Sequence, residues 1–364
     1  MVETRTVGTL RLPDACSDLA ARVDRELTRF VADQRRGMAG HGPGVQALLA
    51  ELERVIGAGG KRLRPVFCCL GHVAAGADVD ERCIRAAAAL ELLHTFAIVH
   101  DDVMDRSPSR RGSPASWVHL ADEHRRAGWV GDPGAYGLAA AVLAGDMALV
   151  LADRALVGSG FPEDRLLPAL RRYERMRVEV VAGQYLDVLA AHRGSAGENE
   201  ARRIAVLKSG GYTVQAPVQI GAILGGGGER LLRCLSGYGV ALGEAFQLRD
   251  DVLGVFGDPV VTGKDRDSDL LEGKRTVLLE KAIAAAAGDD RRFLEERIGR
   301  PDLGAGEVER ARQLLESTGA LDATLGLIDD LVARAGGSLD PGLVPEPAAS
   351  LLAEMAAVVA VRRL

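Results

Sequence analysis

Two pairs of adjacent aspartates, each at the end of an apolar stretch, are the residues of this sequence best suited to chemistry. Asp101-Asp102 and Asp250-Asp251 both end a run that resembles a buried helix, and both are followed by a loop that carries arginine or lysine. Carboxylates in such a position are costly unless cations meet them. The pattern therefore indicates a site for metal ions and for the oxygens of a phosphate group.

The first pair has a third acid four residues after its first member. Residues four apart share a helix face, so Asp101 and Asp105 project together with Asp102 beside them. Such carboxylates repel one another unless a cation intervenes, and Mg²⁺ suits carboxylate and phosphate oxygens. The next loop carries Arg110 and Arg111, whose guanidinium forks match phosphate. A solvated helix end with salt bridges is the alternative, but the apolar run before the motif favours a site above a buried tunnel.

The second pair shares its helix face with a glutamine. Gln247 precedes Asp250 and Asp251, and the glycine-rich loop that follows contains Lys264 and Lys274. A loop of this kind can approach a diphosphate closely, with lysine as a mobile point charge. One such motif is a weak signal, whereas two in one helical chain are much more specific.

The elements that must position these residues are predicted to be helices. Aromatic residues make up only 4% of the chain, and apolar residues recur at helical spacing almost throughout. The clearest predicted helices cover residues 19–31, 84–99, 171–191, 201–224 and 231–255. Glycine and proline breaks are short, so we expect one all-α domain over residues 1–364. Residues 1–17 are expected to be a flexible segment, and the chain after about residue 301 a peripheral helical layer.

Composition restricts the partners and the compartment. The 364 residues are 47% hydrophobic with a formal net charge of -6, which argues against nucleic-acid binding but allows a small anionic substrate. The five cysteines lack zinc-site spacing and suggest a reduced, cytoplasmic protein. No secretory signal is visible, and runs such as 139–144 are too short for a membrane span.

The motifs in this order resemble those of the trans-isoprenyl diphosphate synthases, the polyprenyl synthetase family. The resemblance implies an all-α fold, a single large helical bundle of the isoprenoid synthase type with a central apolar tunnel. It also implies a homodimer. The matching segments are Gly59–Pro65, His94, Asp101–Asp105, Arg110–Gly112, Gly183–Asp187, Lys208-Ser209 and Phe246–Asp251.

The resemblance also implies a role for each matching residue. Mg²⁺, three ions per site with substrate bound, is expected on Asp101, Asp105 and Asp250, supported by Asp102 and Asp187. The diphosphate of the allylic substrate is expected to contact Arg110, Lys208, Ser209, Gln247, Lys264 and Lys274, with Asp251 also catalytic. The diphosphate of isopentenyl diphosphate is expected to contact Gly60, Lys61, Arg64, His94 and Arg111.

The implied reaction joins isopentenyl diphosphate to an allylic diphosphate and yields a linear all-trans polyprenyl diphosphate. Phe96 lies one to two turns before Asp101, where a bulky residue limits chain length in the resembling family, while the next residue, Ala97, is small. This combination favours a C20 product, geranylgeranyl diphosphate. A farnesyl or a longer product is the alternative.

Two positions depart from the family pattern, and three other protein classes compete. Gly254 stands where the second motif usually has its third aspartate, and Ser209 stands where threonine is usual. A class I terpene cyclase would have no use for Lys61, Arg64 or a second diphosphate pocket. A non-catalytic partner subunit would be expected to lose aspartates, and a structural scaffold explains none of the motifs.

Overall fold

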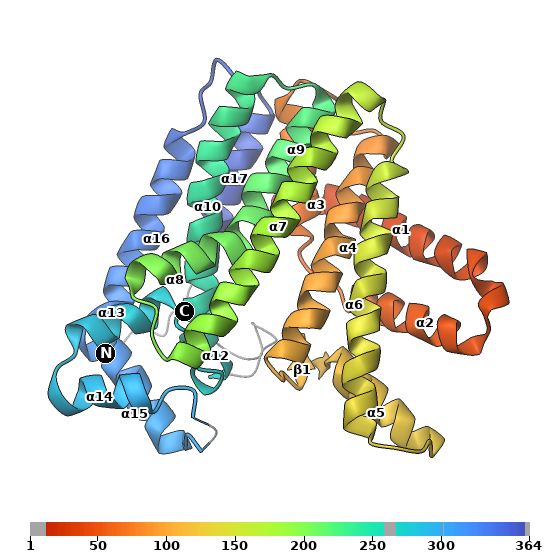
Figure 1. Ribbon diagram of the computed structural model, residues 1–364. Helices are drawn as coiled ribbons and strands as arrows, with labels where there is room; N and C mark the ends of the chain where they lie inside the picture. The colour runs from red at the N-terminus through yellow and green to blue at the C-terminus, as the bar shows by residue number, and fades with distance from the viewer. Residues whose placement is uncertain (1–11, 258–266, 301, 361–364) are drawn as a thin grey trace.

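The computed structural model describes residues 12–257, 267–300 and 302–360, which form a bundle of long helices (Figure 1). The predicted all-α fold is confirmed. Among the described residues the only strands are β1 (Ser109–Arg110) and β2 (Ser113–Pro114), which pair as a small antiparallel hairpin. This hairpin was not predicted from the sequence.

The first half of the bundle contains the helix that ends in the first aspartate motif. Its elements are α1 (Asp14–Gly37), the 3₁₀ turn η1 (Ala39–His41), α2 (Pro43–Gly57), α3 (Leu63–Ala74), α4 (Glu81–Met104), α5 (Ser116–Ala127), α6 (Pro133–Val157) and α7 (Glu163–Arg193). The predicted helices at 84–99 and 171–191 lie inside α4 and α7.

The second half contains the other aspartate motif and the peripheral layer. Its elements are α8 (Glu198–Ala205), the π-helical η2 (Val206–Gln215), α9 (Ala216–Gly225), α10 (Glu229–Phe256), α12 (Ser268–Leu271), α13 (Val277–Ala285), α14 (Gly288–Glu296), α15 (Ala305–Ser317), α16 (Ala320–Gly337) and α17 (Ala348–Ala360). The predicted helix at 201–224 is divided into α8, η2 and α9, with π-helical turns in its middle.

The N-terminal segment is ordered earlier than expected. Residues 14–17 were expected to be flexible, yet α1 begins at Asp14. Cys16 is fully buried in the same hydrophobic cluster as Phe67 and Tyr238, and this burial holds the start of α1 against the bundle. Residues 1–11 lie outside the described residues.

Helix α4 packs at the centre of the first half of the bundle because most of its side chains are apolar. The Asp80 carboxylate caps its start by accepting a hydrogen bond from the backbone N–H of Cys83. Apolar side chains cover nearly its whole circumference, as expected for a helix packed on all sides, and it lies against α6 and α3. Its burial ends at the last turn, where the first aspartate motif begins.

Glycines allow η2 to pack directly on α10. A Cβ atom on Gly210 would lie 2.6 Å from the backbone carbonyl carbon of Gly243, and one on Gly243 would lie 2.7 Å from that of Gly210. No larger residue fits at either position without moving a backbone. This close approach fixes the π-helical segment, and with it Lys208 and Ser209, against the helix of the second motif.

Helices α4 and α6 are longer and more apolar than the short apolar runs noted in the sequence suggested. By length and composition alone, α4 and α6 could each cross a membrane. In the bundle, 72% of the apolar window of α4 and 44% of that of α6 is buried inside the protein. Core helices of a bundle share this composition, so the finding is weak evidence for a span, and the predicted absence of one stays a prediction.

Candidate active site

The two aspartate motifs lie at the same end of the bundle. Helices α4 and α10 both end there, beside the β1–β2 hairpin and α12, at the lower end of the bundle in Figure 1. Helix α7 and η2 pack together along the same region and supply further polar side chains. The site is therefore assembled from six segments of the chain.

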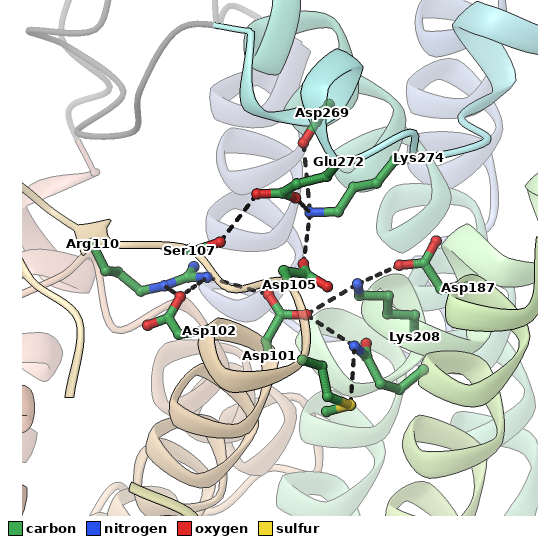
Figure 2. A network of polar contacts seen from close by, with 12 residues as sticks. Asp101, Asp102, Asp105, Ser107, Arg110, Asp187, Lys208, Asp269, Glu272 and Lys274 are labelled. Atoms are coloured by element: carbon green, nitrogen blue, oxygen red, sulfur yellow. Dashed lines mark hydrogen bonds and ion pairs between the residues drawn. The ribbon is translucent and has the colours of Figure 1, made fainter. Parts of the chain in front are cut away.

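Asp101 is the centre of the polar network in Figure 2. Its Oδ1 lies 3.1 Å from Nζ of Lys208 and accepts a hydrogen bond from the side-chain amide of Gln184 at 3.1 Å. Nζ of Lys208 also lies 2.6 Å from Oδ2 of Asp187. The side chain of Asp101 keeps 20% exposure, so it faces a space that solvent can enter.

Arg110 binds the other side of the first motif. Its Nε donates to Oδ1 of Asp102 at 2.7 Å, and its Nη2 lies 3.2 Å from Oδ2 of Asp101. The guanidinium thus bridges the adjacent carboxylates, and Asp102 turns away from Lys208. Arg110 is held in this position by the hairpin on which it lies.

Lys274 forms ion pairs with a second group of acidic side chains. Its Nζ lies 3.0 Å from Oδ2 of Asp105, 3.6 Å from Oδ1 of Asp269 and 2.6 Å from Oε2 of Glu272. Glu272 in turn accepts a hydrogen bond from the hydroxyl of Ser107 at 3.0 Å (Figure 2). These contacts join α12 and the residues after it to the loop that follows α4.

The two adjacent acids of the first motif titrate differently. Burial alone would raise the pKa of Asp101, but Lys208, Lys274 and Arg110 outweigh it and hold that pKa well below its usual value. Burial raises the pKa of Asp102 to about 6, because Arg110 offsets the desolvation only in part. Asp101 therefore stays ionised at any working pH.

The second motif is arranged around Asp251. Gln247 donates from Nε2 to Oδ1 of Asp251 at 2.6 Å, one turn along α10. Burial, with the nearby charges of Asp269 and Asp250, raises the pKa of Asp251 to about 8. Asp250 is half-buried beside it. Asp251 is thus a buried, hydrogen-bonded acid, while Asp250 is the more accessible of the pair.

The hairpin places Arg111 against the first glycine-rich segment. Arg111 and Gly112 both have positive φ, 53° and 71°, which matches the two-residue hairpin turn of type I′. A guanidinium N–H of Arg111 donates to the carbonyl of Gly59. A Cβ atom on Gly60 would lie 3.0 Å from the Arg111 guanidinium, so Gly60 allows the close contact. The structure brings these predicted residues together.

Arg64 and His94 meet through a residue that the sequence analysis did not single out. The Arg64 guanidinium stacks 4.2 Å above the ring of Tyr212 and donates to Oγ1 of Thr213 at 2.8 Å. The hydroxyl of Tyr212 lies 3.3 Å from Nδ1 of His94. Burial and the surrounding arginines lower the pKa of His94 well below its usual value, so the imidazole is neutral. Lys61 is exposed at the start of this segment.

The donor set fits a hard divalent cation. Oδ2 of Asp105 is buried and makes no hydrogen bond in the described part of the chain, although Nζ of Lys274 is near. The ammonium groups of Lys208 and Lys274 each lie between carboxylates from different segments, which marks two places where positive charge is favoured. Within residues 12–257, 267–300 and 302–360, no three ligating side chains converge as a preformed metal site.

Most of the predicted site residues lie around this one region. Lys264 lies outside the described residues, so its predicted role has no structural counterpart here. Ser209 is half-buried on η2 next to Lys208. The sequence analysis missed the roles of Gln184, Asp269, Glu272 and Tyr212. The spacing of Gln184 and Asp187 on one helix face was an available signal for the first of these.

Comparisons with known proteins agree with this geometry. The model of the polyprenyl synthetase family matches residues 45–315. A geranylgeranyl pyrophosphate synthase from Geoglobus acetivorans is 35% identical over 265 residues, 73% of this chain and 75% of that protein. A geranylfarnesyl diphosphate synthase from Aeropyrum pernix is 34% identical over 272 residues, 74% of this chain and 79% of that protein.

A solved structure has the same fold over nearly the whole chain. The crystal structure of geranylgeranyl pyrophosphate synthase from Corynebacterium glutamicum, complexed with isoprenyl diphosphate and magnesium, matches with a TM-score of 0.91 and 33% identity. The match covers 95% of this chain and 99% of that one. The fold and the site thus define a helical enzyme with a diphosphate-type active site. The chain belongs to the polyprenyl synthetase family, and it is a trans-prenyltransferase.

Proposed function

We propose that this enzyme condenses isopentenyl diphosphate with an allylic diphosphate and releases linear geranylgeranyl diphosphate. The observation that carries the proposal is the network in Figure 2, in which two lysines and one arginine converge on the first aspartate motif. Mobile cations beside accessible carboxylates suit a substrate that arrives as a complex of diphosphate and metal. A terpene cyclase or a scaffold would not need the separate basic group around Gly60, Arg64 and Arg111.

Asp101, Asp105 and Asp250 would hold Mg²⁺ in this proposal, with Asp187 and Asp102 in support. Bound Mg²⁺ would stabilise the negative charge that develops on the departing diphosphate. The magnesium named in the Corynebacterium structure supports this choice of metal. The ammonium groups of Lys208 and Lys274 neutralise carboxylates in the free protein. They turn to phosphate oxygens when the substrate binds.

The chain's own residues carry the remaining steps. The bond between the allylic carbon and its diphosphate oxygen breaks, and the oxygen keeps the electron pair, stabilised by Arg110, Lys208 and Lys274. The double bond of isopentenyl diphosphate, held by Arg64 and Arg111, attacks the allylic cation. A proton then passes to the released diphosphate. Water must be excluded, which suits a site enclosed between helices.

The product length follows from the part of α4 that precedes the first motif. On this largely buried helix, His94, Phe96, Ala97 and His100 are half-exposed, and together with Asp101 they form a stripe that leads from the first motif back along α4. A stripe of this kind supports a tunnel for the growing chain. The ring of Phe96 packs edge-on against the imidazole of His100, with the ring centroids 4.7 Å apart. Nε2 of His100 forms a hydrogen bond with the backbone carbonyl of Val142 on α6. We assign Phe96 as the floor that stops growth at C20.

We further propose that the protein works as a homodimer through one face of α6 and α7. Exposed apolar side chains on α6 recur every seven residues at Leu143, Val150 and Val157. On the neighbouring α7, Val178 and Val181 form a similar stripe that continues to Tyr185. Heptad spacing is the pattern of helices that pack against a partner helix. A second copy of the chain covers both stripes at once, as expected for a two-fold interface.

The reduced state of the cysteines supports a cytoplasmic location. All five cysteines are free, and all except Cys234 are buried. Burial raises the pKa of Cys16 to about 12, so this thiol is chemically inert. The formal net charge of -6 argues against nucleic acid and is compatible with small diphosphates as the proposed substrates.

The test is incubation of the purified protein with Mg²⁺, labelled isopentenyl diphosphate and, in turn, dimethylallyl, geranyl and farnesyl diphosphate. A linear C20 diphosphate is expected from each primer. A dominant C15 or C25 product would overturn the assignment of Phe96 as the floor. A cyclic hydrocarbon formed without isopentenyl diphosphate would overturn the reaction itself.

A further inference from the structure

The position that departs from the family pattern in the second motif lies directly beside another acid. Gly254 is buried on α10, one turn after Asp250. A Cβ atom built on Gly254 would overlap the carboxylate of Asp269, with the Asp269 Cγ only 2.9 Å away. The carboxylate of Asp269 therefore occupies the space into which a side chain at position 254 would project.

Backbone contacts hold Asp269 in this position. The backbone N–H of Asp267 donates to the carbonyl of Gly254 at 3.2 Å, and the carbonyl of Asp267 accepts from the N–H of Leu270 at 3.0 Å. Arg312 forms an ion pair with Asp267 and donates to the carbonyl of Val255 at 3.3 Å. The start of α12 is thus fixed on the end of α10, directly by the bond from Asp267 to Gly254 and indirectly through Arg312, which contacts both segments.

Asp269 also points into the site. Its side chain is 9% exposed, and its Oδ1 lies 3.6 Å from Nζ of Lys274, which also contacts Asp105 of the first motif (Figure 2). Asp269 is near enough to Asp251 for their charges to repel. Among the ion pairs of the described residues, this buried carboxylate contacts Lys274, the lysine that the proposed function turns toward the substrate.

We propose that Asp269 is the third carboxylate of the second aspartate motif in this chain, and that Gly254 is required to make room for it. The ligand is the same hard divalent cation that Asp250 would hold, so this inference rests on the proposed function. The third acid is thus supplied by α12 and not by α10. An aspartate introduced at position 254 would displace the carboxylate of Asp269. The second motif would therefore still have three carboxylates and would not gain a fourth.

The experiment is calorimetric titration of Mg²⁺ into the protein in the presence of inorganic pyrophosphate. Asp269→Ala removes the carboxylate, and Gly254→Ala displaces it, so each should weaken Mg²⁺ affinity about tenfold, or about 1.4 kcal/mol. The double variant should be no weaker than either single variant, because both changes act on the same group. Gly254→Asp should bind Mg²⁺ nearly as the unchanged protein does, and adding Asp269→Ala to it should then have little effect.

Two further variants make the result decisive. Glu280 is also buried, at 7% exposure, and accepts two backbone hydrogen bonds, so Glu280→Gln controls for the loss of a buried carboxylate. It should lower the melting temperature without changing Mg²⁺ affinity. Asp250→Ala should abolish Mg²⁺ binding at this position if the proposed function is right.

The outcomes separate the two ideas. Unchanged affinity in Asp269→Ala, or additive losses in the double variant, would overturn the role of Asp269 while Asp250→Ala still supports the proposed site. Unchanged affinity in Asp250→Ala would overturn the metal site of the proposed function itself. If Asp269→Ala does not fold, Asp269→Asn keeps the shape and provides the same comparison.

Discussion

Asp101 is the residue of the first motif that contacts three other segments of the site. It joins Lys208 of η2, Gln184 of α7 and Arg110 of the hairpin. Its low pKa keeps it ionised, so it is available to a cation at all working pH values. The charge of the adjacent Asp102 is balanced by Arg110, which belongs to the same network.

Replacing Asp101 should therefore stop turnover. For Asp101→Asn we expect a loss in kcat of at least about 10²–10³-fold, because an uncharged amide cannot balance Lys208 or hold a metal ion. Steady-state assays with saturating Mg²⁺ measure the effect, and circular dichroism checks the fold. The surface variant Asp329→Asn on α16 is the control. Near-normal activity in Asp101→Asn would contradict the proposed mechanism.

The aromatic ring of Phe96 should set the product length. Phe96→Ala removes the floor and should lengthen the main product by one or more five-carbon units, whereas Ala97→Phe should shorten it. Chromatography of the dephosphorylated products distinguishes these outcomes. Phe30→Ala on α1 removes an equal, partly buried ring that packs against the same hydrophobic cluster as Phe96 but from a different helix, and it should leave the product unchanged. The same product from Phe96→Ala would place the floor at another residue.

The titration of Asp251 should appear as a pH dependence of stability. Its pKa is raised from 3.8 to about 8 in the folded protein, so folding favours its protonated form. The stabilisation that this group contributes is complete below pH 4 and is lost as the pH rises to about 8. In EDTA, Asp251→Asn should gain melting temperature relative to the unchanged protein across pH 5–8. Parallel curves for the two proteins would contradict this assignment.

At the level of elements, the site depends on close helix contacts that only glycine allows. A Cβ atom on Gly183 of α7 would lie 2.6 Å from the carbonyl carbon of Leu207 and 2.7 Å from Cα of Lys208. Both are backbone atoms, which cannot move aside as a side chain would. Gly183 thus sets the distance between α7 and the π-helical segment that carries Lys208.

Gly183→Ala should consequently damage the site through the position of η2. We expect a melting temperature lower by several degrees and a kcat lower by about tenfold or more, as overpacking costs roughly 1–3 kcal/mol. Thermal unfolding and product assays measure the two effects. Gly326→Ala, on an exposed turn of α16 with open space around it, should instead be neutral or slightly stabilising. An unaltered Gly183→Ala enzyme would show that η2 adjusts freely.

At the level of the whole molecule, the apolar face of α6 and α7 predicts the assembly. Val150→Asp combined with Val178→Asp should convert a dimer to a monomer, because two charges would be buried in an apolar contact. Analytical ultracentrifugation measures the change. Val130→Asp is the control, since Val130 is 96% exposed in a loop away from the two stripes. A monomeric unchanged protein, or a dimeric double variant, would contradict the proposed interface.

The sequence by itself determined the helical class, the two aspartate motifs and most of the basic residues around them. Helical periodicity and carboxylates four residues apart are local properties, so they can be read without knowledge of the fold. The predicted helices at 84–99 and 231–255 accordingly lie within α4 and α10. The order of the matching motifs along the chain was sufficient to indicate the family.

Only the tertiary structure decided which side chains meet. Tyr212 joins Arg64 to His94, and Asp269 fills the space beside Gly254, across separations that no local pattern encodes. The hairpin at Arg111 and the π-helical turns at Lys208 also escaped the sequence, because each depends on a neighbouring segment that holds an unusual backbone in place. Local spacing fixes what a helix face presents, whereas packing between distant segments fixes what that face contacts.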